Sequence, residues 1–178
     1  MAHIDVFKSW ADTIRQDIEA FKSLLESHKA DAKARQLAGG TLQYLVSKMD
    51  LIPDWNEGIG VIDDVMILRV ASQLALDMNR GDVSGSSEAS FERLNNEADK
   101  ITAFLGGPVY DKLKAYVAKL GETTVRGRTP TQLSEDEALR KQLYKELDEE
   151  LEKTVPIVIE DPADAELRLK SYLTQKLK

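Results

Sequence analysis

The chain has 178 residues, which is enough for one domain or two small ones. It contains no cysteine, and this excludes a disulfide framework, a thiolate nucleophile and cysteine-ligated zinc. The 24 basic and 31 acidic residues give a net charge of −7, which disfavours general binding to the phosphates of nucleic acids. Because we find neither a signal peptide nor an apolar run of membrane-spanning length, we expect a cytoplasmic protein without an integral membrane segment.

The first predicted element is an amphipathic helix with Asp5 as its expected N-cap. Its apolar residues recur at alternating spacings of four and three, and they are Phe7, Ala11, Ile14, Ile18, Phe21 and Leu25. The stripe is shorter than three clean heptads. It therefore favours a core-facing helix of a bundle over a dimerising coiled coil.

The next segment contains the pair Gly39-Gly40, which either ends one helix or permits close packing within a longer one. Pro53 then breaks the chain, because it disfavours helical geometry at the preceding residue. A second apolar run begins near Ile59 and is interrupted by Arg69. It predicts a buried helix that ends around Asn79.

Residues 80–90 are rich in serine and glycine and are the best linker candidate. They divide the chain into an N-terminal helical region, residues 1–79, and a helical C-terminal region, residues 91–178. The expected fold class is therefore all-α, a helical bundle with a helix–turn–helix hairpin and a helical C-terminal extension.

Three local signals mark the C-terminal region. Arg126 and Arg128 lie in a polar loop, for which a solvated linker is favoured over a phosphate contact. Ser134 has the spacing of a capping box with Glu137 and is expected to begin a leucine-bearing helix. Asp161 precedes a proline and is the expected N-cap of the last helix.

Four aspartates, Asp50, Asp54, Asp63 and Asp64, lie within fifteen residues in an otherwise apolar context. Buried carboxylates require hydrogen bonds, paired charges or a cation. One explanation is that they cap the helices on either side of the turn. The other is that they bind a hard divalent cation, Mg²⁺ or Ca²⁺, with Glu57 as an extra ligand. We favour capping.

The same segment carries an ordered pattern, Tyr-Leu-x-Ser-x-x-Asp-Leu-Ile-Pro-Asp followed by Gly-x-x-Asp-Asp. The matching positions are Tyr44, Leu45, Ser47, Asp50, Leu51, Ile52, Pro53, Asp54, Gly60, Asp63 and Asp64. This pattern resembles the signature of the YkvA-like family, a small helical domain of unknown function, over about residues 40–76. The resemblance implies a helical hairpin around the Asp-Leu-Ile-Pro-Asp corner and implies no activity, substrate or cofactor.

The sequence contains few residue patterns that are typical of catalytic sites, and we assign no catalytic residue. The leading functional hypothesis is a non-enzymatic interaction or scaffold module that acts through a protein partner or through self-association. The first alternative is a divalent-cation-binding protein or a metal-dependent hydrolase that uses the four aspartates. The second alternative is a peripheral membrane-associated protein.

Overall fold

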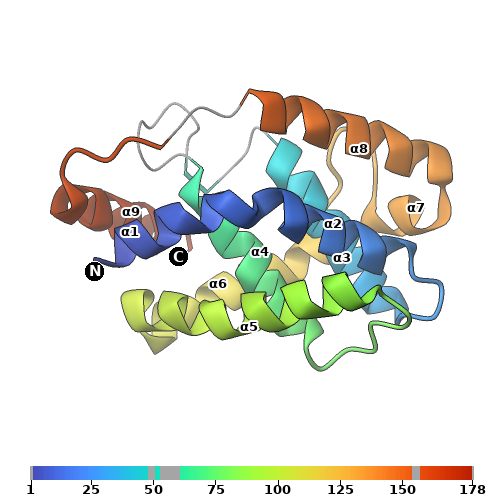
Figure 1. Ribbon diagram of the computed structural model, residues 1–178, viewed down its shortest axis with the longest axis horizontal. Helices are drawn as coiled ribbons and strands as arrows, with labels where there is room; N and C mark the ends of the chain where they lie inside the picture. The colour runs from blue at the N-terminus through green and yellow to red at the C-terminus, as the bar shows by residue number, and fades with distance from the viewer. Residues whose placement is uncertain (1, 48–50, 53–60, 154–156, 178) are drawn as a thin grey trace.

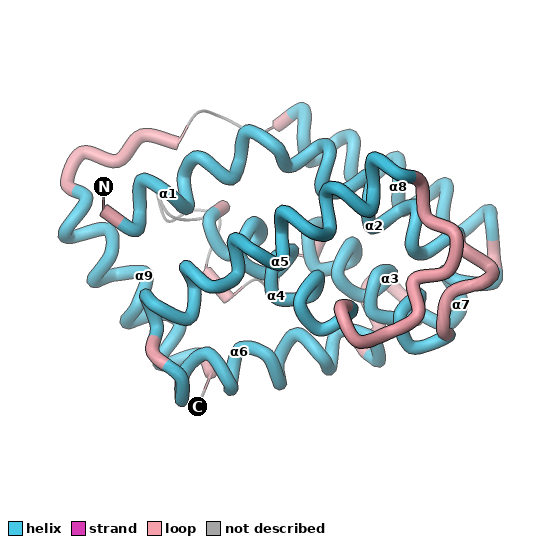
Figure 2. The backbone as a smooth tube through the Cα atoms, turned by 60° about the horizontal axis from the view of Figure 1, so that its bottom comes forward, coloured by secondary structure: helices cyan, strands magenta, loops and turns pink. Residues whose placement is uncertain are grey.

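The computed structural model describes residues 2–47, 51–52, 61–153 and 157–177. These residues form the predicted all-α fold (Figures 1 and 2). The elements are α1 (His3–Ser9), η1 (Trp10–Thr13), α2 (Ile14–Glu26), α3 (Ala32–Val46), α4 (Ile62–Ala75), α5 (Gly85–Leu105), α6 (Gly107–Lys119), η2 (Leu120–Glu122), α7 (Pro130–Glu135), α8 (Glu137–Glu152) and α9 (Pro162–Lys176). The helix α3 packs against α2, α4, α7, α8 and η2, so it lies at the centre of the bundle.

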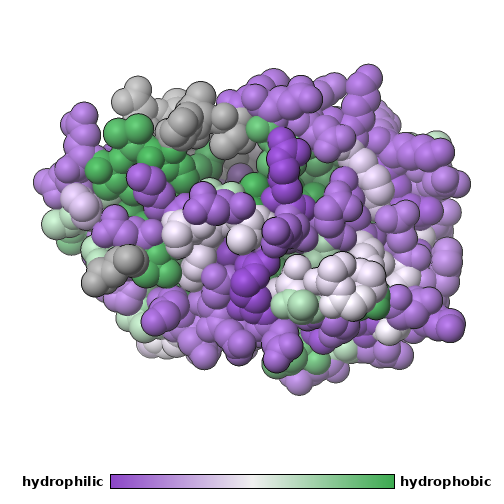
Figure 3. Space-filling model, in the orientation of Figure 1, coloured by the Kyte–Doolittle hydropathy of each residue, from purple (hydrophilic) through white to green (hydrophobic). Residues whose placement is uncertain are grey.

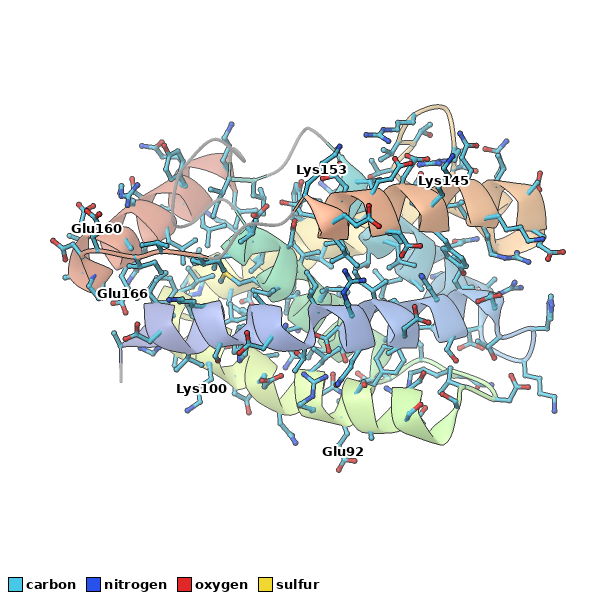
Figure 4. The ribbon with its side chains drawn as sticks, turned by 45° about the horizontal axis from the view of Figure 1, so that its top comes forward. Glu92, Lys100, Lys145, Lys153, Glu160 and Glu166 are labelled. Atoms are coloured by element: carbon cyan, nitrogen blue, oxygen red, sulfur yellow. The ribbon has the colours of Figure 1, made fainter. Side chains whose placement is uncertain are left out.

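The N-terminal apolar stripe faces the core as predicted, but it belongs to two α-helices separated by the 3₁₀ segment η1. Asp5 is not the N-cap, since α1 already begins at His3 and Ala2 precedes it. The physical reason lies in α9, where Glu166 Oε1 accepts a hydrogen bond of 3.0 Å from the backbone N–H of Ile4. A side chain distant in sequence thus satisfies an amide of the first turn. Figure 4 shows Glu166 beside the start of α1.

The glycine pair lies inside α3, which confirms the close-packing alternative. A Cβ atom on Gly40 would lie only 1.9 Å from the carbonyl oxygen of Leu120 in η2. A Cβ atom on Gly39 would instead make an ordinary contact, 3.4 Å from a methyl group of Leu25. Gly40 is therefore the residue that lets η2 lie directly against α3.

The expected linker is shorter than predicted, because residues 85–90 form the first turns of α5. The Ser84 hydroxyl accepts a hydrogen bond of 3.2 Å from the backbone N–H of Ser87 and caps the helix. The serines that indicated a linker therefore begin a helix instead. One hydrophobic cluster contains residues from both sides of this segment, and the division into two regions stays a prediction.

In the C-terminal part, Asp161 caps α9 as predicted, whereas the capping-box prediction for Ser134 is wrong. Asp136 caps α8 by accepting hydrogen bonds from two backbone amides, and Ser134 lies within the preceding helix α7. Ser134 and Asp136 are both residue types that cap helices. Asp136 is nearer to α8, and its carboxylate accepts the hydrogen bonds.

The surface in Figure 3 is mostly hydrophilic, and hydrophobic residues gather towards the end of the molecule that holds α1 and α9. None of the helices in the described part of the chain combines the length and apolar character needed to cross a bilayer.

Candidate functional site

The acidic corner, which consists of Asp50, Asp54, Asp63 and Asp64, is only partly described. Asp63 and Asp64 lie in the first turn of α4, as the capping hypothesis expects, whereas Asp50 and Asp54 lie outside the described residues. Asp63 is 1% exposed, and its Oδ2 accepts a hydrogen bond of 2.5 Å from the Tyr44 hydroxyl. The same hydroxyl accepts a hydrogen bond of 2.8 Å from the backbone N–H of Leu51. Tyr44 therefore joins α3, the chain at Leu51 and the start of α4.

The Tyr44 phenol is a fixed hydrogen-bond donor. Burial raises its pKa well above the ordinary value of 10.0, and the charges of Asp63 and Asp64 raise the pKa further. Both effects disfavour a further negative charge on the phenol beside these carboxylates. The phenol consequently stays protonated at neutral pH and can donate its hydrogen bond to Asp63.

In the part of the chain that the structure describes, no three histidine, aspartate or glutamate side chains are grouped as a metal site requires. The four-aspartate hypothesis also depends on two residues outside that part. Both the capping role and the cation-binding role of Asp50, Asp54, Asp63 and Asp64 therefore stay predictions, and one stability measurement separates them.

We expect Asp63→Ala to lower the free energy of unfolding by about 1–3 kcal/mol, because the buried Tyr44 hydroxyl loses its acceptor. Under the capping hypothesis this loss is the same in the presence and absence of Mg²⁺ or Ca²⁺. The measurement is thermal unfolding of metal-stripped protein with each cation added, and the control is Asp148→Ala, an exposed aspartate on α8. A cation that stabilises the wild type but not Asp63→Ala would instead establish the metal site.

A pocket of about 550 Å³ lies directly beside Tyr44. Its walls come from α3, α6, η2 and the turn that follows η2. The lining residues are Gly40, Tyr44, Ser47, Tyr116, Lys119, Leu120, Thr123, Thr124, Val125 and Arg126.

The surface of the pocket is mainly apolar. The rings of Tyr44 and Tyr116 meet edge to face, with centroids 6.3 Å apart. Leu120 and Val125 add aliphatic surface, and the close approach of Gly40 to η2 brings these walls together. The polar and charged side chains of the lining are mostly exposed; they are Ser47, Lys119, Thr123, Thr124 and Arg126.

The turn beside the pocket has a defined conformation. Val125 and Arg128 exchange two backbone hydrogen bonds of 3.0 Å, and the two residues between them have positive φ, 53° at Arg126 and 76° at Gly127. Positive φ at both central residues is the geometry of a type I′ turn. The chain thus reverses tightly here and places Arg126 on the pocket.

The prediction of a solvated loop is wrong for Arg128, which is only 3% exposed. Arg128 and Arg126 both pair with Glu146 of α8. The Arg128 side chain also donates to Gln43 Oε1 at 3.1 Å, and Arg126 donates to the carbonyl oxygen of Val46 at 3.0 Å. The two arginines therefore fix the turn to α3 and α8.

Glu146 is ionised at neutral pH. Burial alone would raise its pKa, but hydrogen bonds from Arg128 and Arg126 outweigh burial and lower the pKa below 4.5. One carboxylate thus faces two guanidinium groups.

No pattern in the sequence predicts this pocket. Tyr44 is one position of the family signature, and no sequence motif includes Tyr116 or Lys119. The walls come from two segments, residues 40–47 and 116–126, that lie far apart in the chain. Only the fold brings them together.

Comparison with curated proteins and with solved structures gives no match. The family described as "Protein of unknown function (DUF1232)" matches residues 34–69. The match includes most of α3, the acidic corner and the first half of α4, and with them the pocket residues Gly40, Tyr44 and Ser47. Over this range the chain is similar to an uncharacterised helical family.

Proposed function

We propose that the protein is a small-molecule-binding module and that the pocket beside Tyr44 is its binding site. The observation that carries the proposal is the pocket itself. Its volume of about 550 Å³ lies within the range of roughly 300–1,000 Å³ that is typical of ligand sites. Such sites combine apolar walls with a few polar groups that orient the ligand, and this lining has the same character.

Contacts within the protein hold the walls in place. Two hydrogen bonds fix the Tyr44 hydroxyl, and the ion pairs of Arg126 and Arg128 with Glu146 fix the turn. A site whose walls are already ordered loses little conformational entropy on binding. This arrangement supports a pocket that binds in its present shape.

The lining favours binding over catalysis. Among the described residues that line the pocket there is no carboxylate and no histidine, and the Tyr44 phenol stays protonated. General acid–base catalysis at neutral pH usually employs such groups.

The test is a fluorescence titration with N-phenyl-naphthylamine, a neutral probe that brightens in apolar surroundings. We expect saturable binding to the wild type and a loss of affinity of about tenfold or more in Thr124→Trp, because the indole takes up pocket volume. The matched control is Thr131→Trp, on the exposed surface of α7 and outside the pocket. Equal affinity in both variants would contradict the proposal, provided that their circular dichroism matches that of the wild type.

A protein-interaction role, with self-association as one form, is the second candidate function. Leu167 on α9 is 70% exposed, and Val158 in the preceding segment is 68% exposed. Large apolar side chains at the surface suit protein contacts when they cluster. Light scattering over a range of concentrations tests self-association, with Leu167→Glu as the variant that should abolish it. A wild-type mass of one chain at every concentration would contradict self-association.

A further inference from the structure

We infer that the ligand of this pocket is an organic anion, with its apolar part against Tyr116 and Leu120 and its charged group beside Lys119 and Arg126. The inference rests on the proposed function, since it names the ligand class for the same pocket. It is carried by the distribution of charge around the pocket.

The pocket has an excess of positive charge. Lys119 and Arg126 both line it, and no described lining residue is acidic. Arg126 and Arg128 share one carboxylate, Glu146. Among the described residues, no carboxylate lies within ion-pair distance of the Lys119 ammonium group. The described lining therefore contributes two cations and no carboxylate, whereas Glu146 and Asp63 do not line the pocket and are bound to Arg126 and Tyr44.

The cations lie where an anionic group would stay partly hydrated. Lys119 is exposed, and the side chain of Arg126 is 42% exposed. The apolar walls, Leu120 among them, are more deeply buried. A ligand with a charged end and an apolar body matches this gradient, because the charge keeps contact with water while the body leaves it.

Lys119 also has a structural role that requires no ligand. It lies in the last turn of α6, where a cation offsets the partial negative charge of the helix end. That role affects stability alone, whereas the proposed role affects the affinity for anions. A binding measurement therefore separates the two.

The experiment compares two probes that differ by one charged group, anilinonaphthalene sulfonate and the neutral N-phenyl-naphthylamine. We expect the wild type to bind the sulfonate about tenfold more tightly than the neutral probe. Lys119→Gln should remove most of this preference, because it should weaken the binding of the sulfonate far more than the binding of the neutral probe. The matched control is Lys112→Gln, an exposed lysine on the same helix that does not line the pocket, and it should change neither affinity. Added salt should weaken only the binding of the sulfonate.

The possible failures are distinguishable. Equal affinity of the wild type for both probes, or a sulfonate affinity that Lys119→Gln leaves unchanged, would overturn the inference while the binding function stands. A lack of saturable binding of either probe, or binding that Thr124→Trp does not weaken, would overturn the proposed function and the inference with it. Because Lys119 and Lys112 are both exposed, both variants are expected to fold, and circular dichroism checks this.

Discussion

Replacing Arg69 with methionine is expected to lower the free energy of unfolding by about 3–5 kcal/mol, because it leaves buried carboxylates short of a compensating charge. Arg69 is fully buried in α4. Its Nη1 lies 3.6 Å from Asp17 Oδ2 on α2, and its Nη2 lies 3.1 Å from Glu97 Oε1 on α5. The guanidinium group also lies 4.3 Å from the centre of the Trp10 ring. Methionine fills a similar volume without the charge.

Arg93 completes a neutral network of two cations and two carboxylates. Its Nη2 lies 2.5 Å from Asp17 Oδ1, and its Nη1 lies 3.0 Å from Glu97 Oε1. Burial lowers the pKa of Arg69 to about 10, although Glu97 and Asp17 oppose this effect, so Arg69 is charged at pH 7. Burial likewise raises the pKa of Asp17, and Arg93 and Arg69 oppose the rise. Removing Arg69 should raise that pKa further, and the stability deficit should shrink as the pH falls through the raised pKa.

Urea denaturation at neutral pH measures the effect. The control is Arg168→Met, which removes an exposed arginine paired with Asp164 on α9 and should cost less than about 1 kcal/mol. The double variant Asp17→Asn with Arg69→Met restores neutrality, so it should be destabilised by less than the sum of its single changes. If Arg69→Met is no more destabilising than Arg168→Met, the network does not contribute as described.

The second large effect is expected for Gly40→Ala. The new methyl group would lie 1.9 Å from the carbonyl oxygen and 2.4 Å from the carbonyl carbon of Leu120, and backbone cannot move aside as a flexible side chain does. Overpacking of this kind costs about 1–3 kcal/mol or more. It should outweigh the gain of about 1 kcal/mol from the better helix propensity of alanine. Since Gly40 and Leu120 both line the pocket, the variant should also bind the neutral probe more weakly.

Gly39→Ala is the matched control, because it gives the same change one residue earlier in α3. Its methyl group would meet side-chain carbons of Leu25 and Leu133 at 3.4–3.6 Å, which are ordinary contacts. We expect Gly39→Ala to be neutral or to stabilise the protein by up to about 1 kcal/mol. Equal stability of the two variants, measured by thermal unfolding, would show that η2 does not depend on Gly40.

Features that depend on near neighbours could be predicted from the sequence. The apolar stripe that includes Phe21 and Leu25 gave the correct buried face, because helical periodicity alone places these residues together. Asp161 caps α9 by accepting a hydrogen bond from the backbone N–H of Asp164, only three residues further along the chain. Asp63 and Asp64 lie in the first turn of α4 for the same local reason.

Features that depend on distant partners could not be predicted. Arg69 interrupts an apolar run, and its partners Asp17 and Glu97 lie on other helices. Arg128 occupies a polar loop in the sequence, yet it is buried because Glu146 and Gln43 are brought to it by α8 and α3. From the sequence alone a charged residue is expected to be solvated, because its counter-charge lies far away in the chain. The pocket could not be predicted either, since its walls come from two distant segments.

The hydrogen bond between Ile4 and Glu166 bears on how the chain is synthesised. The two residues are 162 positions apart, which at 5–20 residues per second corresponds to on the order of ten to thirty seconds of translation. During that interval the nascent α1 lacks both its capping carboxylate and the apolar face of α9. Ile4, fully buried in the folded protein, is then more accessible to chaperones that bind apolar segments. Among the described helices, α1 is synthesised before all the others and would thus be among the last to dock.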